Sequence, residues 1–79
     1  MQQMSINERK DIDNIISNIV KTRKKKKLSQ SKLAEMCDLP QATISRLESF
    51  SIEPKLSTVI KVCNALDLKV ICKETNEVI

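Results

Sequence analysis

The stretch LSQSKLAEMCDLPQATISRLES, residues 28–49, contains two short helical patterns with almost no chain between them. Isolated helices of fewer than about 12 residues are marginal in water, so neither piece is expected to be stable by itself. Both pieces must therefore gain their stability from packing. This spacing limits the chain to folds in which the two short helices support each other and rest on further helices.

The ends of the two helices are marked by residue type. Ser29 is a good N-cap residue for the first helix, which must stop near Asp38. Helices commonly end with glycine in the left-handed conformation, but this chain contains no glycine. Asp tolerates that conformation better than most residues, so we predict it for Asp38. Pro40 suits the first turn of the second helix, residues 40–49, whose Ile44 and Leu47 are expected to point inward.

A longer helix is predicted before this pair, in residues 11–27. Its apolar residues recur at three- and four-residue steps and form one stripe: Ile12, Ile15, Ile16, Ile19 and Val20. Ser5 with Glu8 has the form of a capping box, although Asp11 is a second possible start. The stripe is expected to face the core.

A fourth helix is predicted after residues 50–54, which Pro54 marks as a non-helical connector. Ser57 is its expected cap. The residues spaced for its buried face are Leu56, Val59, Ile60, Cys63 and Leu66. Residues 68–73 then alternate between apolar and polar character, which predicts a β-strand. A lone strand leaves its backbone groups unpaired, so we expect it to pair with the same strand of a second subunit.

The charge of the chain lies mostly in its first half. Residues 1–46 carry ten Lys and Arg against five acidic residues, whereas residues 47–79 carry four Lys against five acidic residues. The run KTRKKKK, residues 21–27, supplies most of the excess and favours a polyanionic partner. The alternative interpretation is a solvated helix end, where cations also complement the helix dipole.

Other classes of site and location are poorly supported. Cys37, Cys63 and Cys72 are odd in number and lie in apolar patterns, which is typical of buried thiols in a reducing compartment. Without histidine or paired cysteines at ligand spacing, a zinc site is not expected. No catalytic constellation is visible, so we expect neither an enzyme nor a cofactor. No apolar run approaches a membrane span or a signal peptide, which predicts a cytoplasmic protein with no membrane partner.

Two helices joined by a turn of three or four residues form a helix-turn-helix motif, and the detail agrees. Counted from Gln30, apolar or small residues fall at the supporting positions Leu33, Ala34, Leu39, Ile44 and Leu47. Ala34 lies where the helices cross, and a bulkier side chain there would force them apart. Over residues 15–70 the chain resembles the Cro/repressor (XRE) family of phage and bacterial DNA-binding domains. Asp38 departs from the glycine common in that turn.

The resemblance implies an all-α, lambda-repressor-like bundle of four to five helices with a short C-terminal β-strand pairing across a homodimer. The segments LSQ, QATIS and LDLKVICKE look closest to the HipB-type antitoxin repressors, which regulate their own toxin–antitoxin operons. We accordingly divide the chain into an N-terminal arm and helix start (1–10), a DNA-binding domain (11–67), and a C-terminal strand and tail for dimerisation (68–79).

The predicted DNA-binding residues lie in the helix pair and in the basic run. Residues 40–49 form the helix expected to enter the major groove. Gln41 is the best candidate to read a base, because its amide both donates to and accepts from adenine. Ala42 can meet a thymine methyl group, and Ser45 can contact base or backbone. Arg46 can contact guanine, clamp a phosphate, or pair instead with Glu35 or Glu48.

The remaining predicted contacts are to phosphates. Gln30 opens the helix that Ser29 caps, whose N-terminal N–H groups suit a phosphate. The family resemblance implies that Gln30 also braces Gln41. The four lysines of the basic run attract the DNA backbone: Lys24, Lys25, Lys26 and Lys27.

These inferences predict a homodimeric, sequence-specific transcriptional repressor that binds a palindromic operator in double-stranded DNA and acts as the antitoxin of its operon. Two alternatives remain open. The first is a protein-binding module that mainly sequesters a cognate toxin and binds DNA weakly. The second is a phage-type repressor with no toxin partner.

Overall fold

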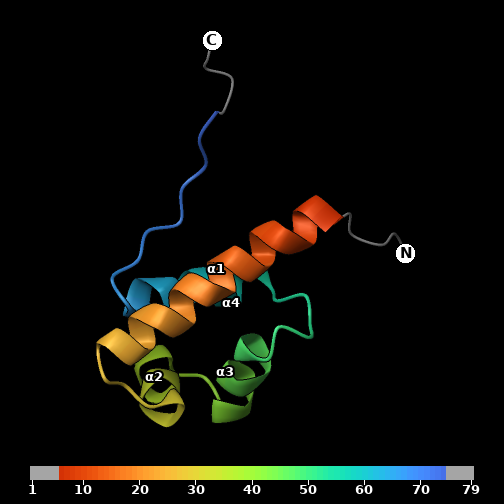
Figure 1. The fold of residues 1–79 in the computed structure, drawn as a ribbon. Coiled ribbons are helices and arrows are strands. Elements are labelled where there is room, and N and C mark those ends of the chain that lie inside the picture. The colour runs from red at the N-terminus through yellow and green to blue at the C-terminus, as the bar shows by residue number, and fades with distance from the viewer. Residues whose placement is uncertain (1–5, 75–79) are drawn as a thin grey trace.

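The computed structural model describes residues 6–74, which form four α-helices (Figure 1). The helices are α1 (Ile6–Lys25), α2 (Gln30–Cys37), α3 (Gln41–Glu48) and α4 (Leu56–Ala65). Helix α2 packs against α3 and α4, and α1 packs against α3. The described part of the chain therefore has the predicted all-α architecture, with the two short helices resting on two longer ones. None of its helices has both the length and the apolar character needed to cross a bilayer.

The core is aliphatic and collects residues from all four helices. Its buried members are Ile16, Ile19, Leu33, Ala34, Cys37, Ile44, Leu47, Val59, Val62, Cys63 and Leu66. Ile44 and Leu47 are 0% and 1% exposed, which confirms their predicted inward orientation. Because each short helix contributes to one shared core, packing supplies the stability that neither helix has alone.

The apolar stripe of α1 is narrower than the sequence predicts. Ile16 and Ile19 are fully buried, and Ile12 and Val20 pack at the edge of the core, but Ile15 is 39% exposed. Helix α1 begins at Ile6, before the second possible start at Asp11 and next to the first one in the sequence. The candidate cap Ser5 lies outside the described residues.

Helix α4 buries part of its predicted face, because Val59, Cys63 and Leu66 are buried as predicted. Val59, Val62, Cys63 and Leu66 form the buried stripe, whereas Leu56 is 68% exposed and Ile60 is 39% exposed. The prediction of Ser57 as the cap is wrong because Lys55 precedes the first helical residue and Ser57 lies in the first turn. The non-helical segment ends soon after Pro54. Helix α4 therefore begins at Leu56, two residues before the start that Ser57 as a cap would give.

The ends of α2 follow the predicted chemistry. The Ser29 hydroxyl accepts a hydrogen bond from the Lys32 backbone N–H at 2.9 Å, which confirms Ser29 as the N-cap. Asp38 adopts the left-handed conformation with φ 56° and ψ 46°, as predicted. Pro40 occupies the N-cap position of α3, one residue earlier than the predicted first turn.

Each of the four helices of the described region is followed, within two residues, by a left-handed residue that is not glycine. These residues are Lys27, Asp38, Phe50 and Asp67, with φ between 56° and 63°. In three of the helices a leucine follows, and its N–H donates to a carbonyl five residues earlier: Leu28 to Arg23 (3.0 Å), Leu39 to Ala34 (2.9 Å) and Leu68 to Cys63 (2.8 Å). Each leucine also packs at the core edge. This is the Schellman arrangement, with a partly buried leucine stabilising a turn that glycine normally forms.

Residues 69–74 form an exposed, extended segment, here termed the C-terminal arm (Figure 1). The predicted strand at 68–73 is absent from this single chain, and no other strand occurs in residues 6–74. No backbone hydrogen bond within the described region involves the arm. A strand needs a neighbour to pair with, and one copy of the chain supplies none.

The three thiols differ in accessibility. Cys37 and Cys63 are buried, but Cys72 is exposed in the C-terminal arm, contrary to the prediction that all three are buried. Burial raises the pKa of the Cys37 and Cys63 thiols, so less of each is the reactive thiolate at neutral pH. We expect Ellman's reagent to modify Cys72 of the native protein much faster than the other two. Equal rates for all three without denaturant would contradict this core, and equal rates in urea are the control.

Candidate nucleic-acid interface

Helices α2 and α3 form the helix-turn-helix geometry that the sequence predicts. Residues 38–40 join them, and Ala34, 3% exposed, lies in the core that the two helices share. Leu33 of α2 and Ile44 of α3 are both fully buried in the same cluster. The pair is therefore one packed unit whose inner sides are fixed against the bundle, and the opposite side of α3 remains on the surface.

The outer face of α3 consists of Gln41, Ala42, Ser45 and Arg46, all of which are exposed. None of their side chains makes a hydrogen bond or an ion pair within residues 6–74, although the Arg46 backbone carbonyl accepts from the Ser49 hydroxyl at 2.6 Å. The prediction that Arg46 can pair with Glu35 or Glu48 is not met, because Glu35 pairs with Lys32 and Glu48 with Arg23. The structure thus brings the four predicted groups together on one short helix and leaves their polar atoms available.

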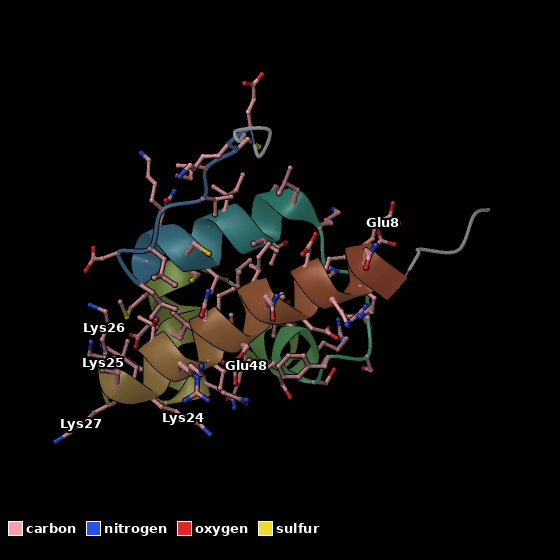
Figure 2. The ribbon with its side chains drawn as sticks, turned by 45° about the horizontal axis from the view of Figure 1, so that its top comes forward. Glu8, Lys24, Lys25, Lys26, Lys27 and Glu48 are labelled. Atoms are coloured by element: carbon pink, nitrogen blue, oxygen red, sulfur yellow. The ribbon has the colours of Figure 1, made fainter. Side chains whose placement is uncertain are left out.

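The lysine cluster (Lys24, Lys25, Lys26 and Lys27) lies at the C-terminal end of α1 and in the turn that follows. Figure 2 shows its four side chains spread around this end of α1, at the opposite end of the helix from Glu8. All four are exposed, and within the described chain only Lys26 makes an ion pair, to Asp67 at 3.3 Å. The turn connects α1 directly to α2, so this positive charge adjoins the helix-turn-helix.

A buried ion pair between Arg23 of α1 and Glu48 of α3 holds α3 in place. Arg23 donates from Nε to Glu48 Oε2 at 2.7 Å and from Nη2 to Glu48 Oε1 at 2.9 Å. Its Nη1 also donates to the Leu28 carbonyl at 2.8 Å. The two side chains are only 11% and 6% exposed. The hydrogen bond to the Glu48 carboxylate raises the pKa of Arg23 above its ordinary value, against the opposing effect of burial.

Gln30 completes this arrangement. Its Nε2 donates to Glu48 Oε1 at 2.9 Å, so the first residue of α2 is tied to the last residue of α3. The brace between Gln30 and Gln41 that the resemblance implied is not among the contacts of the described residues. Gln30 therefore fixes α3 at its end, through Glu48, rather than at its beginning. We refer to Arg23, Gln30 and Glu48 together as the clamp.

The position of Arg23 in the sequence could have predicted the clamp, but Arg23 was counted only as a member of the basic run. Arg23 follows Ile16 and Ile19 at spacings of seven and four residues and thus lies on the apolar stripe. A charged residue on a buried stripe requires a partner of opposite sign. Glu48 directly follows the buried Leu47 and is that partner.

Comparison with protein families agrees with this geometry. Residues 19–70 match the model of the helix-turn-helix family, a region that runs from the second half of α1 to the start of the C-terminal arm. No curated protein and no solved structure shows a significant match. The matched region contains α2, α3 and α4 completely, together with the lysine cluster and the clamp. The chain therefore belongs to the helix-turn-helix family, in its Cro/repressor (XRE) type, and is a DNA-binding transcriptional regulator.

Proposed function

We propose that the protein is a sequence-specific repressor that binds a palindromic operator as a homodimer, with α3 as its recognition helix. The observation that carries this proposal is the outer face of α3, whose side chains are exposed and engaged with no other described residue. The major groove of B-DNA accommodates one α-helix and shows a distinct donor and acceptor pattern for each base pair. Gln41 and Arg46 carry the groups that suit adenine and guanine, Ala42 suits a thymine methyl group, and Ser45 suits either base or backbone.

The lysine cluster supplies the contacts that do not depend on sequence. Its cations adjoin the helix-turn-helix and are solvated, so they can approach phosphates without a large desolvation cost. Gln30 is held by Glu48 in the free protein, and its place at the N-terminus of α2 also suits a phosphate. We assign Gln30 and the lysine cluster to positioning on the DNA backbone.

Dimerisation through the C-terminal arm would supply hydrogen-bond partners for the backbone N–H and C=O groups of the arm. Figure 1 shows the arm leaving α4 on the side away from α2 and α3, so a partner bound there leaves the outer face of α3 accessible. An open groove of about 200 Å³ lies at the base of the arm, lined by Ile15, Leu68, Val70 and Ile71 among others. Two arms paired across a two-fold axis cover this apolar surface. Two-fold symmetry then requires half-sites about 34–36 Å apart.

Proline at Val70 is expected to abolish the dimer. Val70 is 37% exposed and belongs to no helix, so Val70→Pro removes an N–H from the arm without disturbing the core. Val70→Ala keeps that N–H and is the matched control. Sedimentation equilibrium should report a dimer for the wild type and the alanine variant and a monomer for the proline variant. A proline variant that remains dimeric would rule out the arm as the interface.

Selection from a random double-stranded DNA library tests the main proposal. The wild-type protein should enrich a palindromic site, and the logarithm of its affinity for that site should fall linearly with the logarithm of salt concentration. A library that shows no enrichment, or an affinity insensitive to salt, would contradict the proposal.

Toxin binding is a second candidate function. Leu56 and Ile60 of α4 are 68% and 39% exposed, which is apolar surface that neither the core nor the DNA-binding helix uses. Together with the HipB-like sequence segments, this surface supports an antitoxin role in which the same chain represses its operon and sequesters a cognate toxin. A toxin gene beside this one, whose product binds the wild type but not a Leu56→Ser and Ile60→Ser variant, is the expected result. A solitary gene favours the phage-type repressor.

A further inference from the structure

The connector between α3 and α4, residues 49–55, is held by an arginine from the far end of α1. Arg9 Nη2 donates to the Phe50 carbonyl at 2.8 Å, and Arg9 Nη1 donates to the Ile52 carbonyl at 3.2 Å. The same guanidinium donates from Nε and Nη2 to Asp13 Oδ1, at 3.1 and 2.8 Å, which fixes its orientation. In Figures 1 and 2 this connector passes beside the N-terminal half of α1. One side chain thus joins segments more than 40 residues apart in the sequence.

The end of α3 needs this support because it lacks what the other helices have. Helices α1, α2 and α4 each end with a partly buried leucine that donates back to its own helix. After α3 the left-handed residue is Phe50, and the residue that follows is the exposed Ser51. The Ser51 N–H donates to the Ser49 hydroxyl and not to a carbonyl of α3. A left-handed conformation is unfavourable for a bulky side chain such as that of Phe50. The Ser49 hydroxyl caps the Arg46 carbonyl at 2.6 Å, and the contact from Arg9 holds the carbonyl of Phe50 itself.

Arg9 and Arg23 lie near the two opposite ends of α1. They are 14 residues apart in that helix, which is close to four complete turns and roughly 21 Å, so both project from the same face. Arg23 holds Glu48, the last residue of α3, and Arg9 holds Phe50, two residues further on. The C-terminal end of α3 is therefore fixed between two guanidinium groups. Gln30 adds a third contact at Glu48, so Arg9 is the contact that holds the backbone beyond α3.

We propose that Arg9 is a positioning residue for the recognition helix, which sets the angle of α3 by holding the connector carbonyls of Phe50 and Ile52. This inference rests on the proposed role of α3 in reading DNA. Arg9 acts through the backbone of the connector, and the outer face of α3 makes the contacts to DNA. Lysine cannot replace it, because the ammonium lacks the planar set of donors that reaches Asp13 and two carbonyls at once.

Three variants separate positioning from simple charge. Arg9→Gln removes the charge and the hydrogen bonds, Arg9→Lys keeps the charge, and Lys10→Gln removes one charge from the exposed neighbouring residue as the matched control. The first measurement is amide hydrogen exchange of α3 and the connector without DNA. The second is the ratio of affinities for the site selected by the wild type and for a scrambled duplex.

Both Arg9 variants are expected to exchange the amides at the C-terminal end of α3 faster than the wild type and to lower the affinity ratio roughly two- to thirtyfold. Lys10→Gln should match the wild type in exchange and in that ratio. Arg9→Lys should keep the wild-type affinity for the scrambled duplex, because its charge is unchanged. Recovery of the wild-type ratio by Arg9→Lys would mean that charge alone matters, which overturns the proposal.

Two further outcomes also overturn it. Faster exchange with an unchanged ratio would mean that Arg9 holds the connector without orienting α3. A lower ratio with unchanged exchange would mean that Arg9 contacts DNA directly. If the wild type selects no site, the proposed function fails, and the hydrogen exchange of α3 alone decides whether Arg9 holds this helix.

Discussion

Glu48→Ala is expected to lower the free energy of unfolding by about 3–5 kcal/mol, because it leaves the Arg23 guanidinium buried without a counter-ion. A domain of this size has roughly 4–12 kcal/mol in total, so the variant should lose a quarter or more of its stability. The effect should change little with salt, since the pair is screened from solvent. Urea denaturation followed by circular dichroism measures it.

A second variant distinguishes the buried charge from the change in packing. Arg23→Met combined with Glu48→Leu replaces the pair by apolar groups of similar volume, and such replacements are often neutral or stabilising. The double variant should therefore recover most of the stability that Glu48→Ala removes. It also removes the acceptor for Gln30, so its α3 should be less well fixed and its DNA discrimination poorer. A Glu48→Ala protein within about 1 kcal/mol of the wild type would show that the clamp contributes little.

Gln41→Ala is expected to weaken binding to the selected site by about 1–3 kcal/mol and to relax base preference at one position of each half-site. Gln41 is exposed and makes no side-chain hydrogen bond with another described residue, so the free energy of unfolding should stay the same. Asn14→Ala, which removes an exposed amide from α1, is the matched control and should bind as the wild type does. The measurement is a competition assay with every base at each position of the site.

Neutralising the lysine cluster should have a different signature. Replacement of Lys24, Lys25, Lys26 and Lys27 by glutamine is expected to reduce affinity for all duplexes alike. The log–log slope of affinity against salt should also become shallower, by up to about 0.9 for every phosphate that the variant no longer neutralises. Equal and uniform reductions in the Gln41 variant and the lysine variant would contradict the division between reading and positioning residues.

Local chemistry was sufficient to predict the helix-turn-helix itself. Ser29 caps α2, Asp38 adopts the left-handed conformation, and Ile44 is buried, each for a reason carried by the residue and its immediate neighbours. The left-handed residues Lys27 and Asp67 were not predicted, because no residue pattern around them was recognised as a helix end. The signal lay in the leucine that follows each of them, as it follows Asp38.

Contacts between residues far apart in the sequence could not be predicted from local sequence patterns. The bonds from Arg9 to the connector and from Arg23 to Glu48 join residues 25 to 43 positions apart, and no local rule selects such partners. The buried face of α4 was predicted only in part because apolar residues surround much of the helix. The packing against the other helices, α2 among them, buries Val62 and leaves Leu56 exposed. The alternating pattern of the C-terminal arm describes a strand, but a strand requires a neighbour that one chain does not contain.

In the proposed complex, α3 lies in the major groove with Gln41, Ala42, Ser45 and Arg46 against the base edges. Titration of ¹⁵N-labelled protein with its selected duplex, followed by amide chemical shifts, tests this most directly. We predict that the largest changes occur in residues 41–46, with smaller changes in the lysine cluster and at the N-terminus of α2, and none in the C-terminal arm. Changes concentrated on α4 or on the first half of α1, with α3 unaffected, would contradict the account.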